Sequence, residues 1–122
     1  KMTLNADLVV LSACNTAGKA STEAGHEMND GLSGLTRGFL YAGARGVVIS
    51  HWPAKDFVAP QLMKTLFEKL PSQGAARALQ QAQMALLDSA GSNGQPEIMA
   101  HPFAWAVFAV VGDGPKAGSL VN

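Results

Sequence analysis

The residue in this sequence best suited to covalent chemistry is Cys14, the single cysteine of a 122-residue chain. It lies in the stretch VVLSACNTAG, just past a run of branched apolar residues and at the start of a polar loop. A thiol becomes a strong nucleophile when a neighbouring base or positive field favours its thiolate form. Free cysteine is also among the most often buried residue types, so structural core filling is an equal alternative.

A second group of polar and aromatic residues, SHWPAKD, follows another apolar run at residues 50–56. It contains the imidazole of His51, the indole of Trp52 and the carboxylate of Asp56. Trp52 and Asp56 also have ordinary structural interpretations: Trp52 as part of the core, and Asp56 as an exposed acid or as the N-cap of a helix beginning near Phe57. The spacing of these residues does not by itself distinguish a catalytic or binding role from a structural one.

A nucleophilic Cys14 needs a base, and the chain contains three histidines. His26 lies in a polar loop and His101 precedes Pro102, so both are typical of solvated surface positions. His51 is better placed, yet a histidine at the end of a strand is more often structural than catalytic. The sequence therefore offers no compelling base for Cys14.

Phosphate binding is disfavoured, although ACNTAGKAS partly matches the loop pattern G-x-x-x-x-G-K-[ST]. Gly18 and Lys19 fit, but Ala13 replaces the first glycine and Ala20 replaces the hydroxyl residue that should reach Mg²⁺. No helix pattern opens directly after Lys19 to present its N-terminus to an anion. The cysteine and the histidines also lack the short spacings of a structural zinc site, so we expect no metal.

Charge and composition narrow the class of protein further. Nine basic residues balance nine acidic ones and no basic cluster occurs, which argues against a nucleic-acid partner. A lone cysteine forms no internal disulfide, which favours a reducing, cytoplasmic location. There is no signal-peptide pattern and no apolar run near the roughly 20 residues of a membrane span. We expect one compact core, and a chain that starts at Lys1 and enters a strand at once reads as part of something longer.

Strand and helix patterns alternate along the chain. Continuous apolar runs predict strands and 3.6-residue periodicity predicts helices. The predicted strands span about residues 7–12, 46–50 and 103–111, and the predicted helices about 30–42, 57–70 and 74–89. We expect Asp30 to cap the first helix and Gly43 to end it. Gly34 and Gly38 predict close packing against the sheet, with a distorted helix as the alternative. Residues 113–122 are expected to be a flexible tail.

The predicted α/β order brings the two chemical groups together. If strands 7–12 and 46–50 are joined by helix 30–42 as a right-handed crossover, they are parallel and end at one edge of the sheet. Open α/β sheets bind their ligands at that edge. We therefore expect Cys14 and residues 50–56 to share a crevice.

Five blocks in order carry a resemblance from about Ala6 to Gly114. They are ADLVVLSACNTAG, GLSGLTRGFLYAGARGVVISHWPAKD, QLMKTLFEKL, AARALQQAQMALL and HPFAWAVFAVVGDG. The chain resembles the C-terminal part of a CHAT domain, a caspase-like peptidase module often joined to tetratricopeptide repeats. The resemblance implies a partial caspase-like three-layer sandwich, with residues 1–122 forming the nucleophile-bearing portion of one domain.

The resemblance also implies site roles. Cys14 would be the nucleophile of a Cys-His dyad that hydrolyses peptide bonds. The loop after SHW would line the specificity pocket, which gives a substrate-binding set of Ser50, His51, Trp52 and Asp56. Asp56 would select an Arg or Lys side chain at P1, because a desolvated carboxylate is costly unless a cation meets it, and Trp52 would pack along its stem. This chemistry needs no metal or organic cofactor.

Two features depart from the family pattern. The family histidine lies on an earlier strand, some tens of residues before the nucleophile, and only 13 residues precede Cys14 here. The resemblance therefore puts the general base, and one of two oxyanion-hole N–H groups, upstream of Lys1. The second departure is His51, where relatives commonly have leucine in an S-L-W-P block.

The favoured interpretation is a cysteine endopeptidase in the full-length protein, with the isolated chain inactive or nearly so. The alternative is a non-catalytic caspase-like module that binds a peptide or protein without cutting it. The expected partners are a peptide or protein substrate, the missing N-terminal half of the domain and tetratricopeptide repeats in the same protein. An exposed apolar edge, above all strand 103–111, also favours self-association or strand swapping.

Overall fold

A computed structural model describes residues 3–12, 27–92 and 94–119 of the chain. Three strands, four α-helices and one 3₁₀ helix occur in this part of the chain. In order they are β1 (Val9–Leu11), α1 (Glu27–Tyr41), β2 (Gly46–Ser50), α2 (Ala59–Gln73), α3 (Ala75–Ser89), the 3₁₀ helix η1 (Glu97–Ala100), α4 (Pro102–Trp105) and β3 (Phe108–Gly112). The predicted mixed α/β class is confirmed.

The strands form a three-stranded sheet in the order β1-β2-β3. β1 is parallel to β2, with Val10 opposite Val48, and α1 is the connection between them. β3 is antiparallel to β2, with Val110 opposite Val48 on the other side. The sequence prediction that the first two strands are parallel is confirmed.

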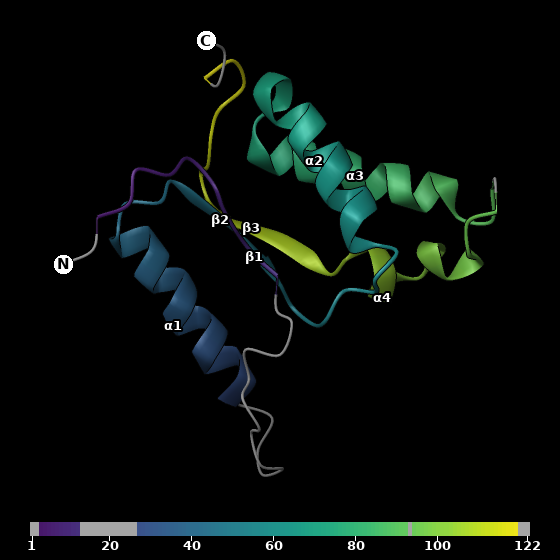
Figure 1. Ribbon diagram of the computed structural model, residues 1–122, viewed down its shortest axis with the longest axis horizontal. Coiled ribbons are helices and arrows are strands. Elements are labelled where there is room, and N and C mark those ends of the chain that lie inside the picture. The colour runs from purple at the N-terminus through teal and green to yellow at the C-terminus, as the bar shows by residue number, and fades with distance from the viewer. Residues whose placement is uncertain (1–2, 13–26, 93, 120–122) are drawn as a thin grey trace.

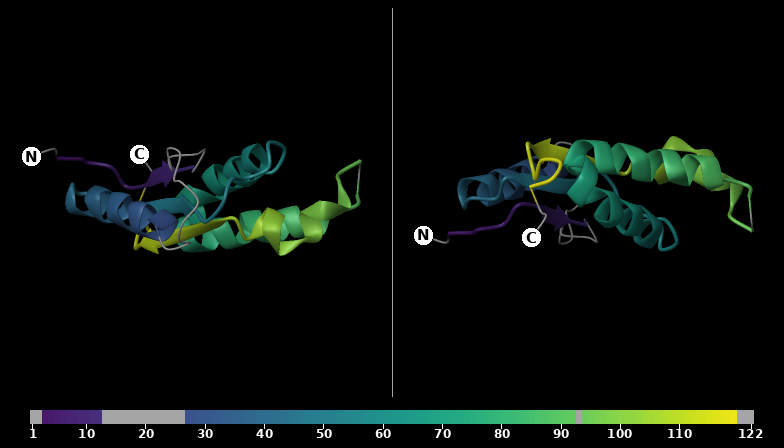
Figure 2. Two further views of the ribbon diagram at one scale, coloured as in Figure 1. Left: turned by 90° about the horizontal axis from the view of Figure 1, so that it is seen from below. Right: turned by 90° about the horizontal axis from the view of Figure 1, so that it is seen from above.

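Helices lie on both sides of the strands. Figure 1 shows α1 on one side of the sheet and the α2–α3 pair on the other. The turned views of Figure 2 agree, with α1 toward one end of the molecule and α2 and α3 together toward the other. The main core lies between the sheet and the α2–α3 pair, where Val48, Leu62 and Leu66 are completely buried.

The two long C-terminal helices follow directly from their apolar spacing. Leucines 62, 66 and 70 recur every four residues in α2 and are all buried. Ala75, Leu79, Ala82 and Leu86 form the matching buried stripe of α3. Gly74 separates the helices with φ +78°, a left-handed value that a residue with a Cβ adopts at a cost. Pro71 lies within the last turn of α2 instead of ending it.

The predicted strand 103–111 is wrong over its first half. Residues 102–105 form the short helix α4, and β3 begins only at Phe108. Pro102 occupies the first turn of α4, where its missing N–H costs nothing, and the His101 side chain caps the helix. A continuous apolar run does not by itself distinguish a buried strand from a buried helix.

Helix α1 also differs from its prediction. It begins at Glu27, so Asp30 lies inside the helix and is not its N-cap. It ends at Tyr41, and Gly43 follows with φ +112°, which confirms the predicted stop. A Cβ at Gly34 or Gly38 would meet no described atom within 4 Å, so the predicted close packing of these glycines is wrong.

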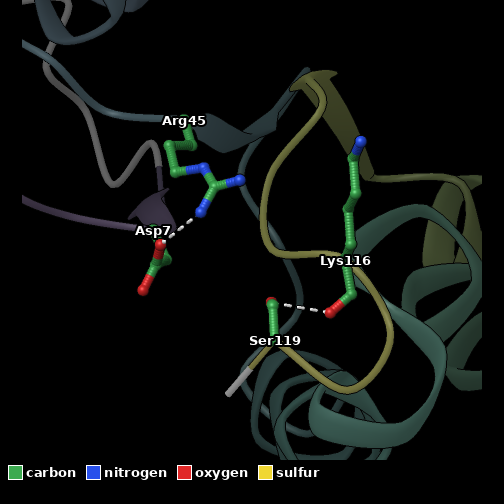
Figure 3. Close-up of polar contacts among 4 residues, drawn as sticks. All are labelled: Asp7, Arg45, Lys116 and Ser119. Carbon is green, nitrogen blue, oxygen red and sulfur yellow. Dashed lines mark hydrogen bonds and ion pairs between the residues drawn. The ribbon is translucent and has the colours of Figure 1, made fainter.

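Arg45, just before β2, forms hydrogen bonds with residues that precede β1 and with a residue that follows β3. Its N–H donates to the Ala6 carbonyl, its carbonyl accepts from Gly114, and its guanidinium donates to the Asp7 carboxylate at 3.2 Å. Figure 3 draws this ion pair and, in the same view, the turn in which the Ser119 hydroxyl donates to the Lys116 carbonyl.

The segment beyond Asp113 packs on the long helices over its described length. Pro115 is buried and its carbonyl accepts the Ala75 N–H at 3.2 Å. The Gly118 N–H donates to the Pro71 carbonyl at 2.8 Å. Residues 120–122 lie outside the described part of the chain, and the flexibility expected for the tail stays a prediction.

Candidate functional site

The candidate site lies where β1 and β2 end. Leu11 is opposite Ile49 in the parallel register, so the chain leaves both strands at the same edge of the sheet. β2 ends at Ser50, and residues 51–58 lead from this edge to α2. Cys14 follows Leu11 by three residues and lies outside the described part of the chain.

The first two residues of SHW lie in different environments. Ser50 is only 1% exposed and is opposite Phe108 in the sheet, so it belongs to the buried end of β2. His51 is exposed, while its backbone N–H donates to the Val107 carbonyl at 2.8 Å and extends the antiparallel ladder by one residue. The ladder therefore fixes the position from which the loop leaves the sheet.

Trp52 is held by Phe103, a residue 51 positions later in α4. The indole Nε1–H donates to the Phe103 carbonyl at 2.7 Å, and the two rings stack with centroids 5.6 Å apart at 11°. The Phe103 N–H in turn donates to Nδ1 of His101 at 3.1 Å. Both backbone groups of Phe103 are thus bonded to side chains. We call the stacked rings of Trp52 and Phe103 the aromatic platform.

Two further side chains approach the aromatic platform. The ring of His51 lies 6.1 Å from the ring of Trp52 and is tilted by 38°. The Lys55 ammonium lies 5.6 Å from the centroid of the Phe103 ring, within the range of a cation–π contact. Phe103 is 42% exposed, so the platform forms part of the molecular surface.

Asp56 does not cap a helix. The N-cap position of α2 is Val58, and no side chain caps it, so that alternative for Asp56 is wrong. The turn before α2 is closed by the backbone, since the Lys55 carbonyl accepts from both Val58 and Ala59. Asp56 is exposed, and among the described residues the one ion pair joins Asp7 to Arg45. Among the described residues, Asp56 therefore neither caps a helix nor forms an ion pair.

The family model for the CHAT domain matches residues 1–113. The chain belongs to the CHAT domain family. The resemblance predicted from the five sequence blocks is thus confirmed. No solved structure matches the chain, so its α/β class rests on its own fold.

Two curated relatives of this CHAT domain are the mouse and human forms of one protein. The chain is 30% identical over 116 residues to the mouse protein named Tetratricopeptide repeat protein 28, which covers 95% of this chain and 4% of the relative. It is 30% identical over 90 residues to the human protein of the same name, covering 74% of this chain and 3% of the relative. The chain therefore spans a small part of these relatives.

The structure shows two contacts at the candidate site that the sequence did not predict. Phe103 was assigned to a strand and Lys55 was given no role, yet Phe103 stacks on Trp52 and the Lys55 ammonium lies over the Phe103 ring. We call residues 50–56 the SHW loop. Contacts across 51 residues leave no local signal in a single sequence. The one usable sign was the His-Pro pair at 101–102, because proline in a first helical turn indicates a helix start.

A separate observation concerns membranes. Among residues 3–12, 27–92 and 94–119, none of the helices combines the length and the apolar character needed to cross a bilayer. The cytoplasmic location expected from cysteine usage stays a prediction.

Proposed function

We propose that this CHAT domain is the nucleophile-bearing part of a caspase-like cysteine endopeptidase. The observation that carries the proposal is the parallel register of β1 and β2, which ends both strands at one edge. Three residues span at most about 11 Å, so the distance along the chain from Leu11 is compatible with Cys14 at that edge. Adjacent strands lie about 4.8 Å apart, which brings the SHW loop into the same neighbourhood.

The reaction proposed for Cys14 is acyl transfer. Its thiolate attacks the scissile carbonyl carbon, the carbon–sulfur bond forms, and the carbon–nitrogen bond breaks as a histidine protonates the departing amine. Water, deprotonated by that histidine, then attacks the thioester and releases the acid product and the free thiol. The Cys14 amide supplies one N–H to the developing oxyanion. The histidine and the second N–H come from chain upstream of Lys1.

The loop at residues 50–56 forms the substrate pocket in this proposal. Trp52 supplies an apolar wall whose position is supported by its stack and hydrogen bond with Phe103. Asp56 supplies a carboxylate for a P1 Arg or Lys, supported by its exposure and by its freedom from helix capping. His51 borders Trp52 on the exposed side. Ser50 supports the loop from its buried position, and its contact with substrate stays a prediction.

The proposal has consequences for the whole protein. The proposed base lies outside these 122 residues, so the isolated chain is expected to be inactive. The rest of a caspase-like three-layer sandwich would come from chain upstream of Lys1, and the name of the relatives supports tetratricopeptide repeats in the same protein. The substrate would be a peptide or protein in the cytoplasm. An unpaired sheet edge would also allow this fragment to self-associate.

A non-catalytic peptide-binding module is the second candidate. The observation that favours it is the use of both described histidines for other contacts. His101 accepts a backbone hydrogen bond through Nδ1, and His51 lies against the Trp52 ring. In that case the edge and the aromatic platform would bind a segment without cleaving it.

The test is peptide cleavage by the full-length protein with fluorogenic Arg and Lys substrates. Cys14→Ala is expected to abolish cleavage, because the nucleophile is lost. Asp56→Ala is expected to lower kcat/KM for basic substrates by about ten- to a hundredfold, the value of a charge-assisted hydrogen bond of roughly 1.5–3 kcal/mol. Glu68→Ala, which removes an exposed carboxylate from α2, is the matched control and should have no effect.

The outcomes separate the two candidates. Cleavage that persists in Cys14→Ala would rule out the proposed nucleophile. Absence of cleavage in the parent protein, together with retained peptide binding, would support the non-catalytic module. Unchanged cleavage of basic substrates by Asp56→Ala would show that the pocket is assigned to the wrong residue.

A further inference from the structure

The aromatic platform is the best-anchored feature near the proposed pocket. Trp52 contacts Phe103 through both a stacked ring and a 2.7 Å hydrogen bond, so the indole is fixed at two points. The His101 side chain and Pro102 together fix the start of α4, which carries Phe103. Two segments separated by 51 residues therefore build one surface that does not depend on loop geometry alone.

Among the described residues, the positive charge beside this platform contacts an aromatic ring and not a carboxylate. Lys55 and Asp56 are adjacent in the chain, yet the Lys55 ammonium lies over the Phe103 ring and forms no ion pair within the described residues. A cation is attracted to the negative face of an aromatic ring, by roughly 0.5–1 kcal/mol at an exposed site. The platform thus already holds a lysine side chain of the protein itself.

We infer that Lys55 is a specificity-determining residue: it occupies the aromatic platform in the free protein, and a basic substrate side chain must displace it. The inference rests on the proposed function, because it concerns the pocket formed by Trp52 and Asp56. A substrate Arg or Lys reaching Asp56 passes along Trp52 and brings a second positive charge close to Lys55. Binding of the basic substrate is weakened because Lys55 loses its contact with Phe103 and because the two cations repel each other.

The inference gives the direction of a charge-removal experiment. Loss of the Lys55 charge should strengthen binding of a basic peptide by about two- to fivefold, which corresponds to the exposed cation–π contact. It should leave a neutral peptide of similar shape unaffected, because neither repulsion nor competition for the ring face applies. The selectivity for the basic peptide therefore rises by the same factor.

The experiment is calorimetric peptide binding to the full-length protein carrying Cys14→Ala, which prevents cleavage. Two peptides are compared, identical except for Arg or norleucine at the P1 position. Lys55→Met removes the charge and keeps the unbranched side chain, whereas Lys55→Arg keeps the charge. Lys64→Met, at an exposed position on α2, makes the same change in net charge away from the platform.

Tighter binding of the Arg peptide by Lys55→Met alone, with norleucine binding unchanged, would support the inference. Equal or weaker binding of the Arg peptide by Lys55→Met would overturn it, and so would an equal gain in Lys64→Met, which indicates a general charge effect. A parent protein that binds both peptides equally would instead count against the Asp56 pocket of the proposed function. Failure of both peptides to bind any variant would overturn both the inference and the proposed pocket.

A second measurement checks the geometry without any peptide. The ring current of Phe103 should shift the NMR signals of the Lys55 ε-CH₂ protons upfield. Phe103→Leu should remove that shift while keeping an apolar side chain in α4. Signals at the ordinary position of an exposed lysine in the parent protein would overturn the inference even if the pocket itself is correct.

Discussion

The two faces of the sheet are covered very differently. Toward α2 and α3, Val48, Leu62 and Leu66 are fully buried and belong to one continuous core. Because side chains alternate along a strand, Val47 and Ile49 point toward α1, where Val47 is fully buried but Ile49 is only half-buried. On α1 itself Leu35 is 43% exposed.

The difference shows where the stability of this chain resides. The α2–α3 pair brings two apolar stripes to one face, whereas α1 contributes one stripe in a helix that contains three glycines. Local stability follows the density of buried apolar contacts. The edge of the sheet that carries the candidate site is connected to both helical layers. Residues 50–58 lead from the sheet to α2, and residue 14 belongs to the connection between β1 and α1.

The largest expected effect lies in the α2–α3 core. Leu66→Ala should lower the free energy of unfolding by about 2–5 kcal/mol, because it leaves a cavity at a fully buried position. Leu35→Ala on α1 should change it by less than about 0.5 kcal/mol. Urea denaturation of the full chain measures both. Similar losses in the two variants would mean that the faces contribute equally.

Two glycine substitutions test the same difference between the two faces of the sheet, with smaller expected effects. An ideal Cβ at Gly46 would lie 2.6 Å from the Gly114 Cα, so Gly46→Ala should destabilise the chain by about 1–3 kcal/mol. Gly38→Ala in α1 meets open space and should stabilise it by up to about 1 kcal/mol. Thermal unfolding of both variants tests the pair. A loss of stability in Gly38→Ala would show that α1 packs more tightly than described.

The smallest expected effect concerns the ion pair at the other end of the sheet. Asp7 and Arg45 are both about half exposed, so Asp7→Asn should cost less than about 1 kcal/mol. The loss should disappear in 1 M salt, where the screening length falls to about 3 Å. Urea titrations at two salt concentrations measure it, with Asp88→Asn on α3 as the control. A loss unaffected by salt would indicate packing instead of charge.

Periodic patterns were the reliable part of the prediction. The stripes through Leu66 and Leu79 predicted α2 and α3, because each helix buries its own face against one neighbour. Two apolar runs predicted β1 and β2 and their parallel pairing. The run at residues 103–111 failed because α4 and β3 are both apolar, and only the backbone geometry after Pro102 separates them.

The candidate site was predicted in part. The topology argument correctly placed the SHW loop at the edge where β1 ends, and the site roles of Cys14, Ser50, His51, Trp52 and Asp56 stay predictions. The N-cap alternative for Asp56 failed because α2 begins two residues later than expected. Phe103 was missed because its partner, Trp52, lies 51 residues earlier.

The sequence by itself determined the CHAT family, the alternation of strands and helices, and the residue types available for chemistry. These properties depend on local pattern and on residue identity, which a chain carries without folding. Only the tertiary structure decided that Phe103 supports Trp52, that Lys55 lies over an aromatic ring, and that Asp56 is free of the helix. Such contacts join distant segments, and they form because the α2–α3 core brings α4 back to the edge of the sheet.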